Sequence, residues 1–218
     1  MHCVVTAGPT YEALDEVRRL TNFSTGRLGT ELAEFLTTRG HTVTLLLGEQ
    51  ATWRATGSVA HVTPFSTTKD LQEKLQVLGD GQIHAVFHAA AVSDFTFGKV
   101  WLRSAAGELS EVRAGKISTR AGTLLAELLP TPKIIAQLRN WFPTALLAGW
   151  KYEVEGGREG VLQLAERQFA ESRTDLCVVN GQAYGDGFGL ARPGGACEHC
   201  ATRIDLLAKL EHCLSVPK

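Results

Sequence analysis

Apolar and polar residues along the chain follow two alternating patterns. Short, nearly continuous apolar runs, typical of buried strands, are separated by stretches in which apolar residues recur at helical spacing. The pattern predicts strands at residues 3–6, 42–47, 83–88, 145–150 and 175–180, and helices at residues 28–36, 70–78, 132–141, 160–170 and 204–214. Strands that alternate with helices form a mainly parallel sheet covered on both faces. The sequence therefore predicts an α/β, Rossmann-like fold in three layers.

Two segments break this alternation. Residues 96–129 mix glycines, charges and β-forming residues over a length too great for a simple connection, so we expect a flap with a functional role. Residues 181–203 contain Gly-Phe-Gly and Gly-Gly turns, which favour a hairpin at the edge of the sheet. With these excursions included, we expect a single domain over residues 1–218, because a chain of this length can bury one sizeable core.

Charge and hydropathy narrow the class of partner. Lys and Arg total 22 against 23 Asp and Glu, so the chain lacks the basic excess typical of nucleic-acid-binding proteins. No segment approaches the ~20 uncharged apolar residues of a membrane helix, and the first residues enter a strand without a basic leader. We therefore expect a cytoplasmic protein that binds small molecules, with no nucleic-acid or membrane partner.

The five cysteines are odd in number, and Cys3 and Cys177 lie in apolar runs, which is typical of reduced, buried thiols. Cys197 and Cys200 have the spacing of a zinc-binding pair. A closed zinc site needs four ligands, and the sequence contains only one such pair. The edge hairpin is the favoured interpretation of this segment, and a zinc site is the alternative.

The segment from Gly8 to Gly29 has the composition of an anion-binding loop. It leaves the first strand at the carboxyl edge of the sheet, where ligands bind in open α/β folds. Its last part, residues 22–29, offers hydroxyls and flexible backbone ahead of a helix N-terminus, which favours phosphate. A dinucleotide site is disfavoured, because G-x-G-x-x-G is absent and no acidic residue ends the strand at residues 45–48. The alternative is that Gly8 and Gly26 only shape turns.

This loop also begins a series of sequence blocks that resemble the phosphopantothenoylcysteine synthetases. The opening signature of that family is similar to Thr-Ala-Gly-Pro-Thr, Leu-Asp-Glu-Val-Arg and Asn-Phe-Ser-Thr-Gly-Arg-Leu-Gly at residues 6–10, 14–18 and 22–29. Later blocks follow in the family's order at residues 89–95, 115–118, 131–135, 148–151 and 175–180. The resemblance covers nearly the whole chain. It is to the stand-alone form of the ligase domain found in the bifunctional coenzyme A biosynthesis flavoproteins.

The resemblance implies an acid–amino-acid ligase. The carboxylate of 4'-phosphopantothenate would attack the α-phosphate of a nucleoside triphosphate, usually CTP. The amine of L-cysteine would then displace CMP from the acyl-cytidylate. Mg2+ would be required, no flavin would be needed, and the protein would form a homodimer. Two alternatives remain: a divergent ligase that joins another carboxylate and amine, and a non-catalytic nucleotide-binding protein.

Three residues are candidates for catalysis. Lys116 in the flap offers a mobile cation that could close over the α-phosphate, with an exposed surface lysine as the alternative. By resemblance, Asn22 is the asparagine that stabilises the intermediate; its alternative is an Asx turn or helix cap. By resemblance, Arg18 lies near the dimer interface and the substrate phosphate, a task suited to a bidentate fork, with Arg19 or Arg27 as substitutes.

The remaining candidates bind substrate or nucleotide. The alanines after the third expected strand let backbone approach a ligand, Asp94 accepts from ribose or approaches a metal, and Trp150 replaces the family's phenylalanine. Tight packing, a turn and a core aromatic are the respective alternatives. Pro132 opens a helix with free amides. The predicted binding residues are Gly8, Thr10, Ser24, Thr25, Gly26, Ala89, Ala90, Ala91, Asp94, Pro132, Lys133, Ile134, Ile135, Trp150 and Asn180. No metal ligands are assigned.

The sequence departs from the family pattern at two places. In the lysine motif of the flap, Ser118 and Thr119 stand where further lysines often occur. The helix before Asp175, which by resemblance supplies two lysines to the triphosphate, lacks lysine there and has Arg167, Gln168, Ser172 and Arg173. The first departure reduces the positive charge of the flap, and the second changes the residues available to the triphosphate, so the choice between CTP and ATP stays open.

Overall fold

The computed structural model describes residues 1–218 except 80, 114, 119–121 and 216–218. Its main sheet has eight strands: β1 (His2–Ala7), β4 (Thr42–Gly48), β5 (His61–Phe65), β6 (Ala85–His88), β10 (Leu146–Tyr152), β11 (Leu176–Asn180), β12 (Phe188–Ala191) and β13 (Cys197–Cys200). Their spatial order is β13-β12-β11-β10-β6-β1-β4-β5. The strands from β11 to β5 pair in parallel, whereas β12 and β13 add an antiparallel hairpin at one edge.

The helices form layers on both faces of this sheet: α1 (Arg27–Thr38), α2 (Thr68–Gly79), α3 (Ile134–Trp141), α4 (Gly157–Ser172) and α5 (Arg203–Ser215). Because side chains alternate along a strand, Val5 of β1 belongs to the core cluster that contains residues of α1 and α5, whereas Val4 belongs to the cluster that contains residues of α2 and α3. Together with the edge hairpin, this arrangement confirms the predicted three-layer α/β fold. None of the described helices combines the length and apolar character needed to cross a membrane.

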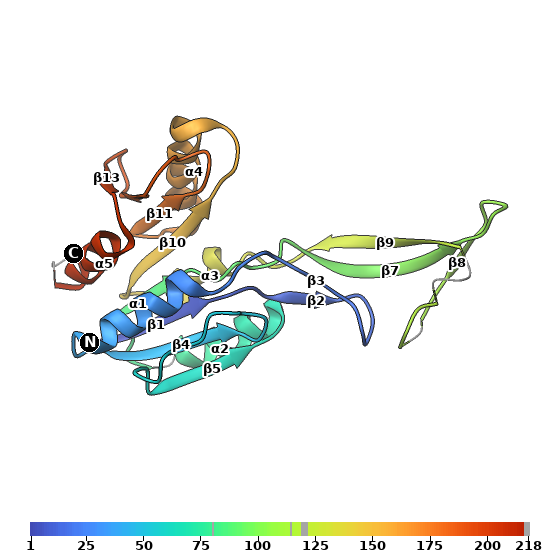
Figure 1. Ribbon diagram of the computed structural model, residues 1–218, viewed down its shortest axis with the longest axis horizontal. Coiled ribbons are helices and arrows are strands. Elements are labelled where there is room, and N and C mark those ends of the chain that lie inside the picture. Colours follow the sequence, from blue (N-terminus) through green and yellow to red (C-terminus); the bar gives the residue numbers. More distant parts are fainter. Residues whose placement is uncertain (80, 114, 119–121, 216–218) are drawn as a thin grey trace.

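The expected flap folds as an antiparallel sheet of three strands, β7 (Phe95–Arg103), β8 (Leu109–Glu111) and β9 (Thr123–Pro130). Figure 1 shows it projecting well beyond the helices and the main sheet, and we call it the arm. A hairpin of β2 (Tyr11–Ala13) and β3 (Arg19–Thr21) runs beside the base of the arm. The sequence predicted an open loop here, which is wrong, because strands of three residues are too short to produce a recognisable alternation.

Two further differences concern single elements. The sequence did not predict β5, an edge strand that contains Pro64 and exposes most of its side chains. It also placed the start of the helix at Pro132, whereas α3 begins at Ile134 with Lys133 as its N-cap. Pro132 therefore lies before the helix and does not occupy its first turn.

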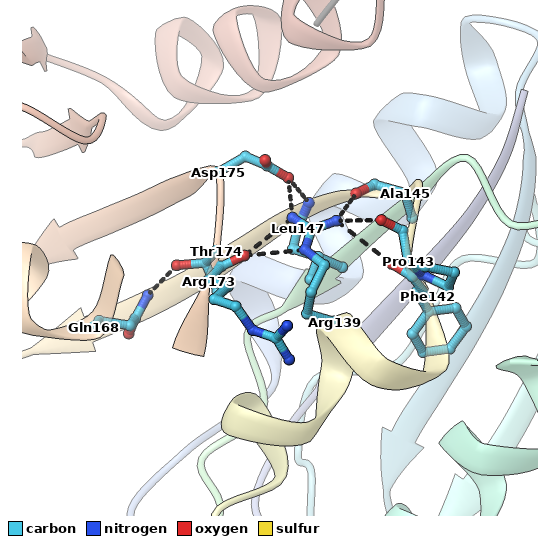
Figure 2. A network of polar contacts seen from close by, with 9 residues as sticks. All are labelled: Arg139, Phe142, Pro143, Ala145, Leu147, Gln168, Arg173, Thr174 and Asp175. Atoms are coloured by element: carbon cyan, nitrogen blue, oxygen red, sulfur yellow. Dashed lines mark hydrogen bonds and ion pairs between the residues drawn. The ribbon is translucent and has the colours of Figure 1, made fainter. Parts of the chain in front are cut away.

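Arg139 of α3 ties this helix to the amino ends of β10 and β11 (Figure 2). Its Nε and Nη2 donate to the carbonyl oxygen of Arg173 at 3.1 and 3.0 Å, and its Nη1 donates to the carbonyl oxygen of Ala145 at 2.8 Å. Nη2 also donates to Oδ2 of Asp175 at 2.7 Å, and the same oxygen accepts from the backbone N of Leu147 at 2.8 Å. A single guanidinium thus holds the far edge of the sheet, opposite the carboxyl ends of the strands.

Candidate functional site

The order of the main sheet reverses between β1 and β6, since the chain continues from β1 to β4 on one side and from β6 to β10 on the other. Such a switch point leaves a crevice at the carboxyl ends of the strands. Here the segments that follow β1 and β6 lie side by side. The backbone N of Ala91 donates to the carbonyl oxygen of Gly8 at 3.0 Å, and that of Thr10 donates to Ala91 at 3.1 Å. The fold therefore brings the loop after β1 together with residues 89–92 after β6, which we call the alanine-rich segment.

The side chain of Thr10 connects the loop after β1 to the segment after β6. Its hydroxyl accepts from the backbone N of Ser93 at 2.8 Å, donates to Oγ of Ser93 at 3.1 Å and lies 3.3 Å from Oγ1 of Thr68. The residue is completely buried. The expectation that Thr10 contacts a ligand directly is therefore wrong for its side chain, which positions the two loops.

Gly8 and Gly26 have left-handed backbone conformations, with φ of 81° and 78°. A Cβ atom on either residue would lie 2.8 or 3.0 Å from Cβ of Ala51. Both glycines are therefore required for turns that pack against a neighbouring loop. Any contribution they make to a ligand site comes through the course of the backbone.

The N-terminus of α1 opens at the same edge of the sheet. Its N-cap is Gly26, which has no side chain, and Oγ1 of Thr25 accepts from the backbone N of Arg27 at 3.3 Å. The first amides of a helix have no intrahelical acceptor, and the helix dipole favours an anion there. Thr25 is exposed and Ser24 is half-buried, so both hydroxyls lie at the entrance to this anion-favouring position.

Asn22 spans the gap between the two loops. Its Nδ2 donates to the carbonyl oxygens of Ala91 at 3.3 Å and Val92 at 3.2 Å. Its side chain does not cap its own loop, and in the described part of the chain its Oδ1 has no hydrogen-bond partner. The amide is therefore fixed by its nitrogen, with an exposed oxygen at the mouth of the crevice.

The other two catalytic candidates lie elsewhere in the chain. Lys116 is exposed, and its neighbours Gly115 and Ile117 hydrogen-bond to the turn between β2 and β3. That turn is at the opposite end of the hairpin from Asn22, roughly 10 Å away at about 3.3 Å per residue. Within one chain, Lys116 and Asn22 are therefore not brought into contact. Thr119 of the same motif lies outside the described residues.

Arg18 does not direct a free fork toward the crevice. Its Nε and Nη2 donate to Oδ2 of Asp15 at 3.0 and 2.5 Å, and Nη2 also donates to the carbonyl oxygen of Ile117 at 2.7 Å. The expectation of a phosphate-binding fork is thus not met within one chain. The proposed substitutes are also engaged: Arg19 covers the ring of Tyr11, and Arg27 pairs with Glu31 and covers the ring of Trp53.

Asp94 and Lys133 form an ion pair at the start of α3. Both side chains are mostly exposed, and such pairs contribute little stability, so a ligand can separate them at small cost. Across the residues that the structure describes, no three His, Cys, Asp or Glu side chains cluster closely enough to hold a metal. Asp94 is therefore a single carboxylate beside the crevice, and it is not part of a preformed metal cage.

The predicted residues around α3 and β10 differ in accessibility. Pro132 and Lys133 are exposed, and Ile135 is half-buried. Ile134 is in the core, so only its backbone could meet a ligand, which corrects the expectation for its side chain. Trp150 packs against the core on the side of α1, and its Nε1 is buried without a partner among the described residues.

Asn180 ends β11 at the carboxyl edge of the sheet. Its carbonyl oxygen accepts from the backbone N of Glu153 at 3.1 Å, and its half-buried side chain lies next to the end of β10, where its register partner is Tyr152. The strand thus places Asn180 at the expected edge, while Trp150 is half-buried and packs against the core.

The four residues that stand in the region of the family's triphosphate lysines lie at the carboxyl end of α4 or directly after it. This helix begins after the carboxyl end of β10 and returns to the amino end of β11, so its last turns are remote from the crevice. Gln168 and Ser172 are buried, Arg173 donates to Oδ1 of Asn140 at 2.5 Å, and Arg167 is exposed on the same part of the helix. The end of α4 therefore lies away from the crevice in this chain.

Two cations missed in the sequence lie nearer to the carboxyl edge. Lys151 follows Trp150 on β10 and is half-buried, and Arg158 lies in the first turn of α4. Arg158 donates to the hydroxyl of Tyr184 at 3.0 Å and covers its ring at 4.6 Å. Their positions in the sequence could have identified them, because residues at the end of a parallel strand or at the start of the next helix lie at the ligand-binding edge of the sheet.

The cysteine pair on β13 does not form a metal site. Cys200 is buried in the core that contains α5, whereas Cys197 packs against the core that contains α4, on the other face of the sheet. Residues three apart on a strand point to opposite faces. The zinc alternative is therefore excluded for this pair, and the predicted edge hairpin is confirmed.

His88 is the last residue of β6 and directly precedes the alanine-rich segment in the chain. Its Nδ1 lies 2.9 Å from Oγ1 of Thr6, and that hydroxyl accepts from the backbone N of Ala90 at 3.1 Å. Burial lowers the pKa of His88 from 6.5 to about 4. A neutral histidine thus supports the segment that borders the crevice.

This burial predicts an acid-sensitive fold. Between pH 6.5 and 4, His88 binds a proton in the unfolded chain but not in the folded one, so stability falls as the pH is lowered through this window. We expect a loss of about 2 kcal/mol between pH 7.5 and pH 5. His88→Gln should remove this part of the pH dependence in denaturant titrations, whereas substitution of the exposed His212 by Gln should keep it. An unchanged slope in His88→Gln would contradict the assignment.

Comparison with known proteins agrees with this arrangement. Residues 1–196 match the family described as the DNA/pantothenate metabolism flavoprotein C-terminal domain. The coenzyme A biosynthesis bifunctional protein CoaBC of Thermococcus kodakarensis is 31% identical over 178 residues, which cover 81% of this chain and 40% of that protein. The chain thus spans about two fifths of the length of the curated CoaBC relatives that head the comparison.

Solved structures extend the similarity to the whole fold. The DNA/pantothenate metabolism flavoprotein from Streptococcus pneumoniae has a TM-score of 0.84 and 26% identity, with 99% of this chain and 98% of that chain covered. The Cab2 mutant H337A in complex with phosphopantothenate-cysteine shares the fold, with a TM-score of 0.72 at 17% identity over 98% and 87% of the two chains. The chain therefore belongs to the family of the DNA/pantothenate metabolism flavoprotein C-terminal domain.

Proposed function

We propose that this protein is a phosphopantothenate–cysteine ligase that uses a nucleoside triphosphate, with CTP preferred. The observation that carries the proposal is the position of Asn22, whose amide is held against Ala91 and Val92 at the switch point of the sheet, beside the open N-terminus of α1. Family membership and the phosphopantothenate-cysteine bound to the similarly folded Cab2 support the same substrates. The product would enter coenzyme A biosynthesis.

The proposed reaction has two steps. A carboxylate oxygen of 4'-phosphopantothenate attacks the α-phosphorus of CTP, and pyrophosphate leaves. The neutral amine of L-cysteine then attacks the acyl carbon, an amide bond forms, and CMP leaves with the oxygen that came from the carboxylate. The attacking amine loses one proton. Both steps bring anions together, so the site must stabilise negative charge with preorganised donors.

The residues of the crevice suit these tasks in different ways. The first-turn amides of α1, with Ser24 and Thr25 at their entrance, form the anion-favouring position. Asn22 offers its oxygen to the entering amine while its nitrogen stays bound to the alanine-rich segment. Asp94 is accessible for a ribose hydroxyl or a metal, because its pairing with Lys133 is exposed. The ammonium group of Lys116, in the arm, binds the α-phosphate.

Mg2+ fits this arrangement as a companion of the triphosphate. This ion is usually held by one or two carboxylates together with substrate phosphates and keeps several waters. A lone accessible carboxylate such as Asp94 meets that pattern, and its exposed partner Lys133 can turn toward a phosphate. When bound, the ion would neutralise phosphate charge, while the protein residues orient the acyl group and the amine.

We also propose that the protein is a homodimer formed through the arm and the adjoining hairpin. Phe23, beside Asn22, is fully exposed. Large apolar side chains are also exposed along the arm and the hairpin, namely Val17, Leu20, Phe95, Leu109, Leu125, Leu128 and Leu129. Large exposed apolar side chains in such number are typical of a protein–protein contact. A partner would also account for the separation of Lys116 from Asn22, since it could bring one to the other.

Sedimentation velocity tests this assembly. The chain has a mass of 23.6 kDa, and we expect a species of twice that mass, converted to monomer by Leu128→Asp. A monomeric wild-type protein at micromolar concentration would contradict the dimer.

The five cysteines are free thiols, which suits the proposed cytoplasmic location, where thiols stay reduced.

The proposed function is tested by incubation with 4'-phosphopantothenate, L-cysteine, Mg2+ and each nucleoside triphosphate in turn. We expect pyrophosphate and phosphopantothenoylcysteine, both dependent on cysteine and fastest with CTP. Nucleotide binding without pyrophosphate release would favour the non-catalytic protein. Pyrophosphate release with a different carboxylate or amine, and none with this pair, would favour the divergent ligase.

A further inference from the structure

The turn between β2 and β3 is fastened to the part of the arm that includes Lys116. The centre of the contact is Asp15, whose side chain is fully shielded from solvent. Its Oδ1 accepts from the backbone N of Val17 at 3.0 Å and Arg18 at 2.8 Å, which closes the turn itself. Its Oδ2 accepts from the backbone N of Ile117 at 3.1 Å and from Nε of Arg18 at 3.0 Å. Oδ1 thus bonds only within the turn, whereas Oδ2 bonds both to Arg18 of the turn and to Ile117 of the arm.

Further bonds reinforce the contact on both sides. Nη2 of Arg18 donates to the carbonyl oxygen of Ile117 at 2.7 Å, and the backbone N of Glu16 donates to the carbonyl oxygen of Gly115 at 2.9 Å. A Cβ atom at Gly115 would lie 2.9 Å from the carboxylate carbon of Glu16, so this exposed side chain lies close to the Gly115 backbone. Hydrogen bonds from Arg18 hold the pKa of the Asp15 carboxyl well below its usual range, which keeps it ionised at neutral pH.

We propose that Asp15 is a positioning residue of the ligase reaction, which fixes the place of Lys116 through Ile117 and Arg18. Lys116 lies between two residues whose backbones are bonded to the turn, while its side chain is exposed and has no partner in the described part of the chain. Its backbone is thus held and its amine is free to meet a phosphate. This inference rests on the proposed function, since it assigns Lys116 to the α-phosphate.

Asp15→Asn separates the two oxygens of the carboxylate. The amide oxygen can still close the turn at the Oδ1 position, but an NH2 group at the Oδ2 position would face the donors of Ile117 and Arg18. We expect kcat to fall about 10- to 100-fold, because misplacement by about 1 Å can cost that much, with a smaller change in KM for the nucleotide. Glu108→Gln, the same exchange at an exposed position of the arm, should retain wild-type kcat.

A double-variant cycle distinguishes positioning from a general structural effect. If Asp15 acts through Lys116, Asp15→Asn should lower kcat no further in a chain that already contains Lys116→Gln. Equal losses in both backgrounds would overturn the assignment, since Asp15 would then act independently of the lysine. A wild-type kcat in Asp15→Asn would overturn it as well.

Hydrogen exchange of the Ile117 amide, measured without substrates, tests the contact itself. Exchange should be slow in the wild type and in Glu108→Gln, and faster in Asp15→Asn at equal global stability. Equal protection in all three proteins would overturn the positioning role. If the wild type releases no pyrophosphate, the proposed function fails, whereas the exchange experiment still decides whether Asp15 fixes the Lys116 segment.

Discussion

Lys116→Gln is expected to lower kcat about 100-fold while leaving the fold intact, in line with the loss of one preorganised donor to a charged transition state. The side chain is exposed and has no partner among the described residues, so glutamine removes charge without breaking a contact. In the first step, negative charge accumulates as the carboxylate meets the α-phosphate. The loss should therefore fall on pyrophosphate formation.

Single-turnover experiments without cysteine isolate that step. The substituted protein should form acyl-nucleotide and pyrophosphate slowly, and its melting temperature should match that of the wild type. Lys99→Gln provides the matched control, because it removes another exposed lysine of the arm. If Lys116→Gln formed acyl-nucleotide at the wild-type rate, this lysine would not act in the first step.

Arg139→Ala is expected to destabilise the fold by about 3 kcal/mol, at the lower end of the range for breaking a largely buried ion pair. Arg139 is 13% exposed and Asp175 is 30% exposed, so water can compensate part of the loss. The substitution also removes donors from the carbonyl oxygens of Arg173 and Ala145 at the amino edge of the sheet (Figure 2). For a chain of this size, the melting temperature should fall by roughly 6–12 °C.

Thermal and denaturant unfolding measure this effect. Arg113→Ala removes the same charge from an exposed pair with Glu111 and should change stability by less than about 0.5 kcal/mol. Arg139→Lys keeps the charge but cannot serve all five acceptors of the guanidinium, so its stability should fall between those of the wild type and Arg139→Ala. Equal stabilities for Arg139→Ala and Arg113→Ala would contradict the anchoring role of Arg139.

The main sheet could be predicted from sequence because each buried strand is a nearly continuous apolar run between helical segments. β5 escaped that test, since Pro64 and exposed side chains give an edge strand no apolar run. The hairpin of β2 and β3 also escaped it, because its strands are stabilised by contacts with β7 and by the buried Glu12. The carboxylate of Glu12 accepts from the backbone N of Thr68 at 3.0 Å and from the hydroxyl of Thr96 at 3.0 Å. Such long-range contacts leave no local pattern.

The candidate site shows the same limit at the level of single residues. Sequence reasoning found the loops that meet at the switch point, because strand ends share one edge of a parallel sheet. It could not separate a side chain that is exposed at the crevice, such as Asn22, from Thr10 and Ile134, which are buried. Nor could it foresee that Asp15 would engage the fork of Arg18. Those distinctions depend on burial and on partners far away in sequence.

If this crevice activates a carboxylate on the α-phosphate of a nucleotide, one oxygen of that carboxylate must pass to the nucleotide, and isotope labelling detects this transfer. The reaction is run with 4'-phosphopantothenate whose carboxylate is labelled with oxygen-18, together with L-cysteine, CTP and Mg2+. Mass spectrometry of the products should find one labelled oxygen in CMP and none in pyrophosphate. Labelled inorganic phosphate with unlabelled cytidine nucleotide would contradict the account, since the carboxylate would then have attacked the γ-phosphate.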